Sequence, residues 1–143
     1  MNEIKFDYIA QHEDTDIFMH QQFTLEQIEG SDFIKQWQQK FKRFFIIARR
    51  RYSGFNLSDG REVYEGDIFE VIDDANILIR CVCEYGKFIR EIYDNEVEIH
   101  GFYFRRLYDN KKTFTITKNY LNKHDIDMFK YVGNIYENLE LMK

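Results

Sequence analysis

The sequence predicts a mainly β protein with a short helical segment near its N-terminus. Short apolar stretches alternate with polar residues, and Gly, Asp and Asn separate these stretches at regular intervals, which is typical of a barrel or a sandwich. Aromatic residues make up 17% of the 143 residues, which is enough to build a core. This length fits one domain, so we expect a β core with at most a small appendage.

Two helices are expected between residues 24 and 43. Thr24 and Gln27 match a capping box, which predicts a short helix that ends near Gly30. Ser31 is expected to cap a second helix. Its apolar residues recur at helical spacing, at Phe33, Ile34, Trp37 and Phe41.

Strand-like alternation predicts the remaining elements. At Phe44 the apolar period changes from helical to strand-like. We therefore divide the chain into an N-terminal strand and helical appendage, residues 1–43, and a β core, residues 44–143. The expected strands cover residues 4–9, 17–23, 44–52, 68–72, 77–85, 87–93, 102–108, 114–120, 131–132 and 134–136, with a helical turn over 122–129.

The charge of the chain does not favour a dedicated nucleic-acid binder. Twenty Lys and Arg residues against 25 Asp and Glu residues give a net charge of −5, whereas such binders are usually basic. The charges are unevenly distributed. Residues 1–30 hold seven acids and one Lys, a net of −6, and residues 31–51 hold seven bases and one acid, a net of +6. These segments can neutralise each other, within a subunit or between subunits.

The two cysteines and the N-terminus indicate a cytoplasmic protein. Cys81 and Cys83 are expected on one face of a strand, which suits neither a structural disulfide nor a zinc site, so we expect reduced thiols. The N-terminus has no continuous apolar run and does not resemble a signal peptide. No apolar stretch approaches the roughly 18 residues that would span a bilayer, so no membrane association is expected.

Two motifs in the second half of the chain resemble those of a known family. The first covers residues 52–54 and 59–68, and the second covers residues 132–138, with the letters V-G-N-I-Y-E-N. Their order and spacing resemble the YopX-like family of bacteriophages, prophages and Firmicute genomes. The resemblance implies a partly open β-barrel with SH3-like strand turns, a phage or prophage origin and homo-oligomerisation, and it implies no catalytic residue. The sequence departs from the family pattern at Leu57, Asp59 and Leu139.

The motif residues are interpreted as corners of the sheet. Glycine permits positive φ in turns, and Asp59-Gly60 fits a tight turn between strands. Asp67 can accept backbone N–H bonds where the chain reverses. A shared binding site is the alternative for the same group of residues, which comprises Tyr52, Gly54, Gly60, Tyr64, Glu65, Gly66, Asp67, Gly133, Asn134, Tyr136, Glu137 and Asn138.

No pattern in the sequence indicates an enzyme, a metal site or a cofactor. The glycines lack the spacing of a Walker or Rossmann phosphate loop. A cysteine nucleophile needs a neighbouring base, and nothing in the sequence fixes one beside Cys81 or Cys83. The four histidines are widely separated in sequence, at His12, His20, His100 and His124.

The basic segment Arg49-Arg50-Arg51-Tyr52 is the sharpest local feature of the sequence. Arginine binds phosphate through two parallel hydrogen bonds, and a tyrosine can stack on a base, so the segment is a candidate nucleic-acid site. On a strand, Arg49 and Arg51 share one face and Arg50 takes the other. The alternative is an edge strand whose charges prevent aggregation or form salt bridges with acidic residues.

Phe33, Trp37 and Phe41 form an aromatic stripe on the second predicted helix. Such a stripe either packs in the core or forms an oligomer or partner interface, where aromatic residues are enriched.

We therefore expect a phage- or prophage-encoded, non-enzymatic interaction module that forms homo-oligomers and binds a host or phage macromolecule. The alternative is a nucleic-acid-binding protein that uses residues 49–52. An enzyme is the third hypothesis, and no cofactor is expected.

Overall fold

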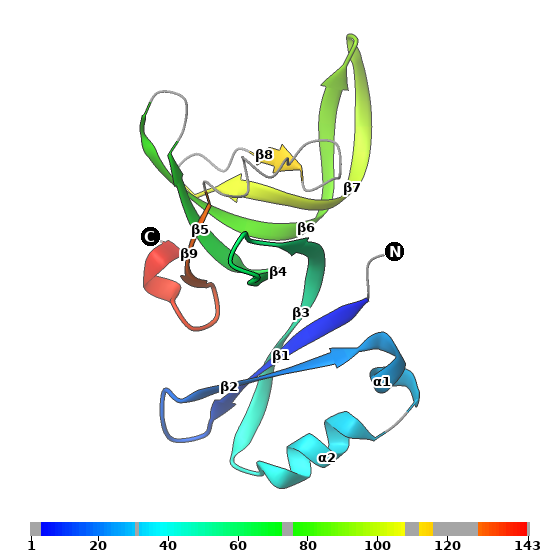
Figure 1. Cartoon of the computed structure of the whole chain (residues 1–143), viewed down its shortest axis with the longest axis vertical. Helices are drawn as coiled ribbons and strands as arrows, with labels where there is room; N and C mark the ends of the chain where they lie inside the picture. The colour runs from blue at the N-terminus through cyan, green and yellow to red at the C-terminus, as the bar shows by residue number, and fades with distance from the viewer. Residues whose placement is uncertain (1–3, 31, 73–75, 108–111, 116–128, 143) are drawn as a thin grey trace. The chain divides into compact units, whose positions relative to one another are not determined.

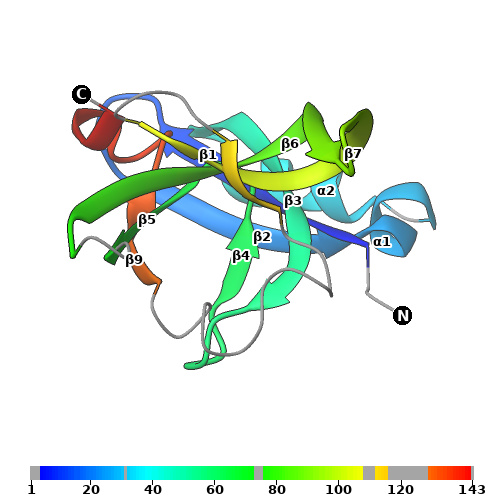
Figure 2. The same cartoon turned by 90° about the horizontal axis from the view of Figure 1, so that it is seen from above.

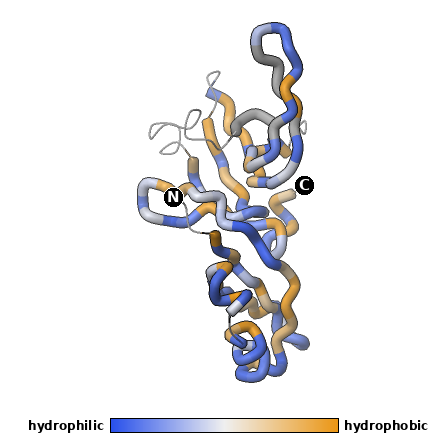
Figure 3. Tube along the Cα trace, turned by 90° about the vertical axis from the view of Figure 1, so that its right-hand side faces the viewer, coloured by the Kyte–Doolittle hydropathy of each residue, from blue (hydrophilic) through white to orange (hydrophobic). Residues whose placement is uncertain are grey.

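Two compact units, residues 1–54 and 55–143, make up the chain, and β-strands dominate both. The computed structural model describes residues 4–30, 32–72, 76–107, 112–115 and 129–142. Figure 3 shows that hydrophobic and hydrophilic residues are interspersed along the chain. The mainly β prediction is confirmed for the described residues.

The first unit contains an antiparallel sheet in which β1 lies between β2 and β3. Because β1 is central, its residues pair with both neighbouring strands. The elements are β1 (Lys5–His12), β2 (Phe18–Thr24), α1 (Leu25–Gly30), α2 (Phe33–Lys40) and β3 (Phe44–Asn56), as Figure 1 shows.

The predicted capping box is present at the start of α1. The backbone N–H of Gln27 donates to Thr24 Oγ1 at 3.1 Å, and the backbone N–H of Thr24 donates to Gln27 Oε1 at 2.9 Å. The two bonds satisfy orphan donors at the helix N-terminus. Asp32 is the N-cap residue of α2, and the predicted cap Ser31 lies outside the described residues.

The boundary between the units lies later in the chain than the predicted division at residues 43 and 44. The strand that begins at Phe44, as predicted, belongs to the first unit as far as Gly54. The reason is its pairing with β1, which extends from Phe44↔His12 to Arg51↔Phe6. The change in the spacing of apolar residues marks the start of β3, but it does not reveal which strand β3 pairs with.

The second unit contains a five-stranded antiparallel sheet in the order β8-β7-β6-β5-β9. Strand β4 instead follows β3 in the order of the first sheet, β2-β1-β3-β4. The elements after β3 are β4 (Glu62–Tyr64), β5 (Asp67–Ile72), β6 (Leu78–Ile92), β7 (Asn95–Arg106), β8 (Lys112–Thr115), β9 (Lys130–Asn134) and a 3₁₀ turn, η1 (Leu139–Met142), as Figure 1 and Figure 2 show.

An aromatic cluster forms the core of the second unit. The ring centroid of Phe69 lies 5.7 Å from that of Phe104 and 5.9 Å from that of Phe129. The centroids of Phe104 and Phe129 are 4.8 Å apart. Cys81 and Cys83 lie fully buried in the same cluster as free thiols. Phe104 packs edge-to-face on both Phe69 and Phe129, an arrangement that is favourable beyond the area the rings bury.

The predicted strand ranges 77–85, 87–93 and 102–108 imply breaks at Gly86 and Gly101, and these breaks were wrong. β6 and β7 run through these residues, which pair with each other in an uninterrupted ladder. The reversal occurs at Tyr93 and Asp94, where the predicted strand 87–93 ends, and their φ angles of 49° and 62° suit a two-residue hairpin turn.

Two other predictions depend on residues outside the described ranges. Only Lys112–Thr115 is described from the region of the predicted strand 114–120, and the predicted helical turn 122–129 lies almost wholly outside. The pairing of the described strands leaves β8 and β9 as the end strands of the second sheet. The partly open barrel therefore stays a prediction.

Candidate interaction site

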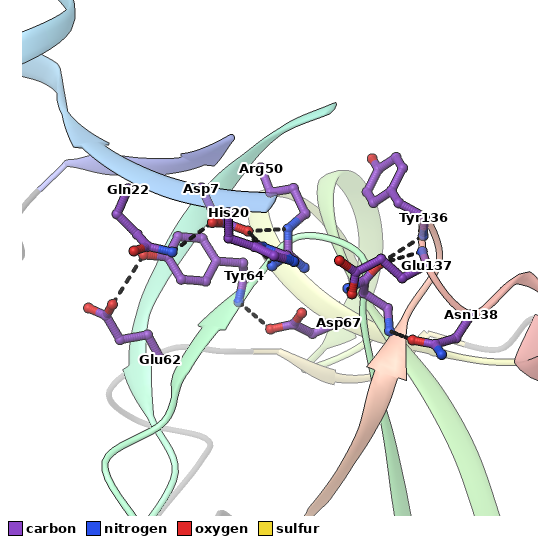
Figure 4. Close-up of polar contacts among 11 residues, drawn as sticks. Asp7, His20, Gln22, Arg50, Glu62, Tyr64, Asp67, Tyr136, Glu137 and Asn138 are labelled. Carbon is purple, nitrogen blue, oxygen red and sulfur yellow. Dashed lines mark hydrogen bonds and ion pairs between the residues drawn. The ribbon is translucent and has the colours of Figure 1, made fainter. Parts of the chain in front are cut away.

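A buried carboxylate lies at the centre of the sheet of the first unit. Asp7 on β1 pairs in register with Gln22 on β2 and with Arg50 on β3, and it is fully buried. Arg50 donates to Asp7 Oδ2 from Nη2 at 2.6 Å and from Nε at 3.1 Å, and Gln22 Nε2 donates to Asp7 Oδ1 at 2.7 Å. Figure 4 shows these side chains converging on the carboxylate.

His20 completes this group, which we call the Asp7 network (Asp7, His20, Gln22 and Arg50). His20 Nδ1 lies 2.8 Å from Asp7 Oδ2, and because a carboxylate only accepts, Nδ1 carries the donated proton. Burial raises the pKa of Asp7, but the hydrogen bond from His20 and the charge and hydrogen bonds of Arg50 outweigh it, so the pKa lies below its ordinary value. The Asp7 network therefore holds a stable anion that links β1 to both of its neighbours.

The structure separates the residues of the basic segment. Arg49 and Arg51 are exposed, whereas Arg50 is buried in the Asp7 network, so the predicted alternation of faces is confirmed. Tyr52 is half-buried, and the ammonium group of Lys5 lies 4.7 Å from the centroid of its ring. The four residues do not form one surface, and Arg49 and Arg51 are the exposed arginines of the segment.

The aromatic stripe on α2 is not fully buried. Phe33 is 44% exposed, and every residue of α2 is exposed or half-buried. Trp37 packs edge-on against Phe23 with the ring centroids 6.0 Å apart, which attaches α2 to the sheet. Phe41 packs edge-on against Phe44, with the ring centroids 6.2 Å apart.

In the second unit, the later part of the first motif, residues 59–68, lies beside the second motif, whereas residues 52–54 belong to β3 of the first unit. β5 pairs with β9 so that Asp67 is opposite Asn134 and Ile68 is opposite Gly133. The backbone N–H of Ile135 donates to the Gly66 carbonyl at 2.9 Å. Segments about 70 residues apart in the sequence therefore form one structural junction.

Residues of the first motif bond to one another. Asp67 Oδ2 accepts the backbone N–H of Tyr64 at 2.8 Å, as predicted, and the Tyr64 hydroxyl donates to Glu62 at 3.2 Å. Gly66 has φ of 85°, and a Cβ there would lie 3.0 Å from the Tyr136 ring. Gly60 has the predicted positive φ in a turn, and Glu65 is half-buried in the turn before β5. Gly54 also has positive φ, but it lies inside β3, so the predicted turn at Gly54 was wrong.

Asn134 organises the second motif. Its Oδ1 accepts the backbone N–H groups of Tyr136 and Glu137, each at 2.9 Å, and its Nδ2 donates to Glu137 at 3.0 Å. Asn138 Oδ1 in turn accepts the Asn134 N–H at 3.1 Å. A Cβ at Gly133 would collide with the Asn138 side chain, which explains the requirement for glycine. These contacts support the interpretation of the motifs as corners of the sheet.

The described residues contain no cluster of three or more His, Cys, Asp or Glu side chains that could hold a metal ion. Burial raises the pKa of Cys81 to about 11, so its thiol stays protonated at neutral pH and is a poor nucleophile. His100 pairs with Lys87 in the β6–β7 ladder. The fourth histidine, His124, lies outside the described residues.

The fold and the motif junction define a mainly β protein in which two sequence motifs close one corner of a sheet. The family described as YopX protein matches residues 5–143, so the chain belongs to the YopX family, as the motifs predicted. A search of curated proteins found no match. Across the described ranges, no helix combines the length and the apolar character that crossing a membrane requires.

We predict that Asp7→Asn removes a pH-dependent part of the stability. Because the pKa of Asp7 is lowered by folding, its ionised form stabilises the protein above the unfolded pKa of about 3.9, and this contribution is lost as the pH falls through the folded pKa. Leaving Arg50 without its partner costs about 3–5 kcal/mol at neutral pH. Urea unfolding from pH 7 to pH 2 measures both effects.

The control is Asp16→Asn, at an exposed position of the β1–β2 turn. We expect this variant to retain the free energy of unfolding of the wild type at each pH. An Asp7→Asn variant with the same stability as the wild type at pH 7 would contradict a stabilising role for the ionised Asp7 carboxylate.

Proposed function

We propose that the protein is a non-enzymatic interaction module, encoded by a phage or prophage, that forms homo-oligomers in the host cytoplasm and binds a host or phage macromolecule. Membership of the YopX family supports the phage or prophage origin. A partly open barrel in the second unit is part of the proposal. The observation that carries the interaction role is a ribbon of two strands with exposed apolar side chains.

The ribbon consists of residues 84–102 of β6 and β7, which pair with each other as far as Ile92↔Asn95. Within the described residues, β5 pairs with β6 only as far as Val82, and β8 pairs with β7 only from Tyr103. Figure 1 shows the ribbon extending from the sheet of the second unit to the turn between β6 and β7. Two strands alone are marginally stable in water, so such an extension favours a contacting partner.

Apolar side chains are exposed along the ribbon. Tyr93 at its tip is 94% exposed, Ile89 is 61% exposed, and Tyr85 and Val97 are also exposed. Charged groups lie between them, including the ion pair of Lys87 and Glu98 at 2.7 Å. Apolar side chains with a polar surround are typical of protein interfaces, and tyrosine is enriched there.

We predict that the double variant Ile89→Ser/Tyr93→Ser forms an assembly with fewer subunits, and therefore a lower mass, than the wild type. Both side chains are exposed in the described chain, so their loss removes interface area with little effect on the melting temperature of the subunit. Sedimentation velocity across a concentration series measures the mass.

The control is Leu139→Ser, which removes an apolar side chain that is 67% exposed outside the ribbon. It is expected to keep the wild-type mass. Equal masses for the ribbon variant and the wild type, or a wild-type protein that is a monomer at every concentration, would contradict the proposal.

A nucleic-acid-binding role is the second candidate, and the exposure of Arg49 and Arg51 on β3 supports it. Arg50 is fixed by Asp7 at 2.6 Å, so the strand holds its two neighbours on the opposite face. The net charge of −5 argues against this role, which makes it secondary.

For this candidate we predict that Arg49→Glu/Arg51→Glu abolishes binding to a fluorescent 30-nucleotide DNA or RNA at low salt. The charge reversal removes two phosphate contacts and places two acids beside the nucleic-acid backbone, and phosphate contacts supply the salt-dependent part of the affinity. Lys35→Glu/Lys130→Glu is the control, because it changes the charge equally at two exposed positions elsewhere. Wild-type protein that does not bind either probe in 50 mM salt would reject the candidate.

A further inference from the structure

The outer edge of β2 is a candidate interface. β2 is the end strand of the order β2-β1-β3-β4, and β1 pairs with its inner edge over Phe18–Thr24. No other described strand pairs with β2. A strand with one open edge presents backbone N–H and C=O groups that can extend the sheet with another chain.

The sequence of β2 lacks the features that usually block such an edge. The strand reads F-M-H-Q-Q-F-T and contains no Lys, Arg, Asp, Glu or Pro, in a chain with 31% charged residues. Its central residues His20, Gln21 and Gln22 are exposed. Natural sheets prevent edge pairing with charges, prolines or bulges, and β2 has a regular register with β1 throughout.

We propose that a second copy of this chain binds at β2, so that two β2 strands pair antiparallel about a two-fold axis and join the two sheets of the first units. The proposal deepens the proposed self-assembly and rests on it. It assigns to β2 an interface separate from the ribbon of the second unit.

The chemistry of β2 favours its own copy as the partner. When two β2 strands overlap fully, Gln21 is opposite Gln21 of the partner subunit, and His20 is opposite the partner's Gln22. A two-fold axis places identical residues near each other, so a charged strand would repel its own copy. β2 has no acidic residue and no Lys or Arg, and its glutamine side chains can both donate and accept.

The Asp7 network holds β2 in the conformation that pairing requires. His20 and Gln22 bind Asp7 at 2.8 Å and 2.7 Å, which attaches the middle of β2 to the central strand by side chains as well as by its backbone. A preorganised edge loses less conformational entropy on binding. The same network that stabilises the sheet therefore prepares its open edge.

A cysteine at the predicted two-fold axis tests the proposal directly. In an antiparallel pair, opposite Cα atoms are about 4.5–5.5 Å apart, which is within the range that a disulfide bridges. We expect mild oxidation of Gln21→Cys to give a covalent dimer on a non-reducing gel. Cys81 and Cys83 are fully buried, so they do not contribute cross-links. Gln36→Cys, at an exposed position of α2, is the matched control and is expected to stay monomeric on the gel.

A charge at the same position provides the second measurement. Gln21→Lys places two lysines opposite each other across the axis, so we expect at least a tenfold weaker dimer by sedimentation, and Gln36→Lys should leave the dimer unchanged. Absence of the cross-link, or equal cross-linking of the Gln36→Cys control, would overturn the proposal. A wild-type monomer that binds another protein through β2 would also overturn it.

The outcomes separate this inference from the proposed function. A ribbon variant that loses its assembly while Gln21→Cys fails to cross-link rejects the β2 interface and leaves the interaction module in place. Cross-linking of Gln21→Cys in the Ile89→Ser/Tyr93→Ser background supports β2 pairing independently of the ribbon.

Discussion

The first unit depends on the interactions of one ionised carboxylate, that of Asp7. It is buried in the central strand of the sheet, where an unpaired charge would cost several kcal/mol. Arg50 and Gln22 reach it from the two neighbouring strands, so each of its oxygens has a partner. A cluster with this many partners is stabilised only when all three strands are in the correct register.

Register decides which side chains the first unit presents. A shift of one residue in β3 would move Arg50 to the opposite face and place Arg49 or Arg51 against the buried side. The pair Asp7↔Arg50 therefore fixes the exposure of the two neighbouring arginines as well as the alignment of β3. Through His20 and Gln22 it also positions β2, whose open edge is the proposed dimer contact.

The second unit is stabilised differently: side-chain oxygens accept hydrogen bonds from backbone N–H groups. Asn134 and Asp67 each accept backbone N–H groups at a chain reversal, and glycine leaves room for the contacts at Gly66 and Gly133. The residues that carry the YopX resemblance are thus largely engaged with one another. The surface proposed for a partner, the ribbon, lies outside the motifs.

Local signals in the sequence predicted local structure well. The Thr24–Gln27 capping box, the start of β3 at Phe44 and the acceptor role of Asp67 each depend on residues within a few positions of one another, and each is present. The prediction of a strand end at Gly86 was wrong, because a glycine paired with another glycine inside a ladder has the same local sequence pattern as a turn glycine.

The Asp7 network could not be predicted, because Asp7 and Arg50 are 43 residues apart and meet only through strand pairing. The one available signal was the even spacing that puts Arg50 on the face opposite Arg49 and Arg51. That signal identified the face of β3 on which Arg50 lies, but it did not identify Asp7 as its acidic partner. The open edge of β2 also depends on strand order, which no local pattern reveals.

A double-mutant cycle on Asp7 and Arg50 tests the central claim most directly. The free energies of unfolding of the wild type, Asp7→Asn, Arg50→Gln and the double variant give the coupling energy, and the exposed pair Glu13 and Arg43 provides a reference. The account predicts a coupling of about 2–3 kcal/mol for Asp7 and Arg50 and below about 1 kcal/mol for the reference pair. Equal coupling energies for the two pairs would contradict it.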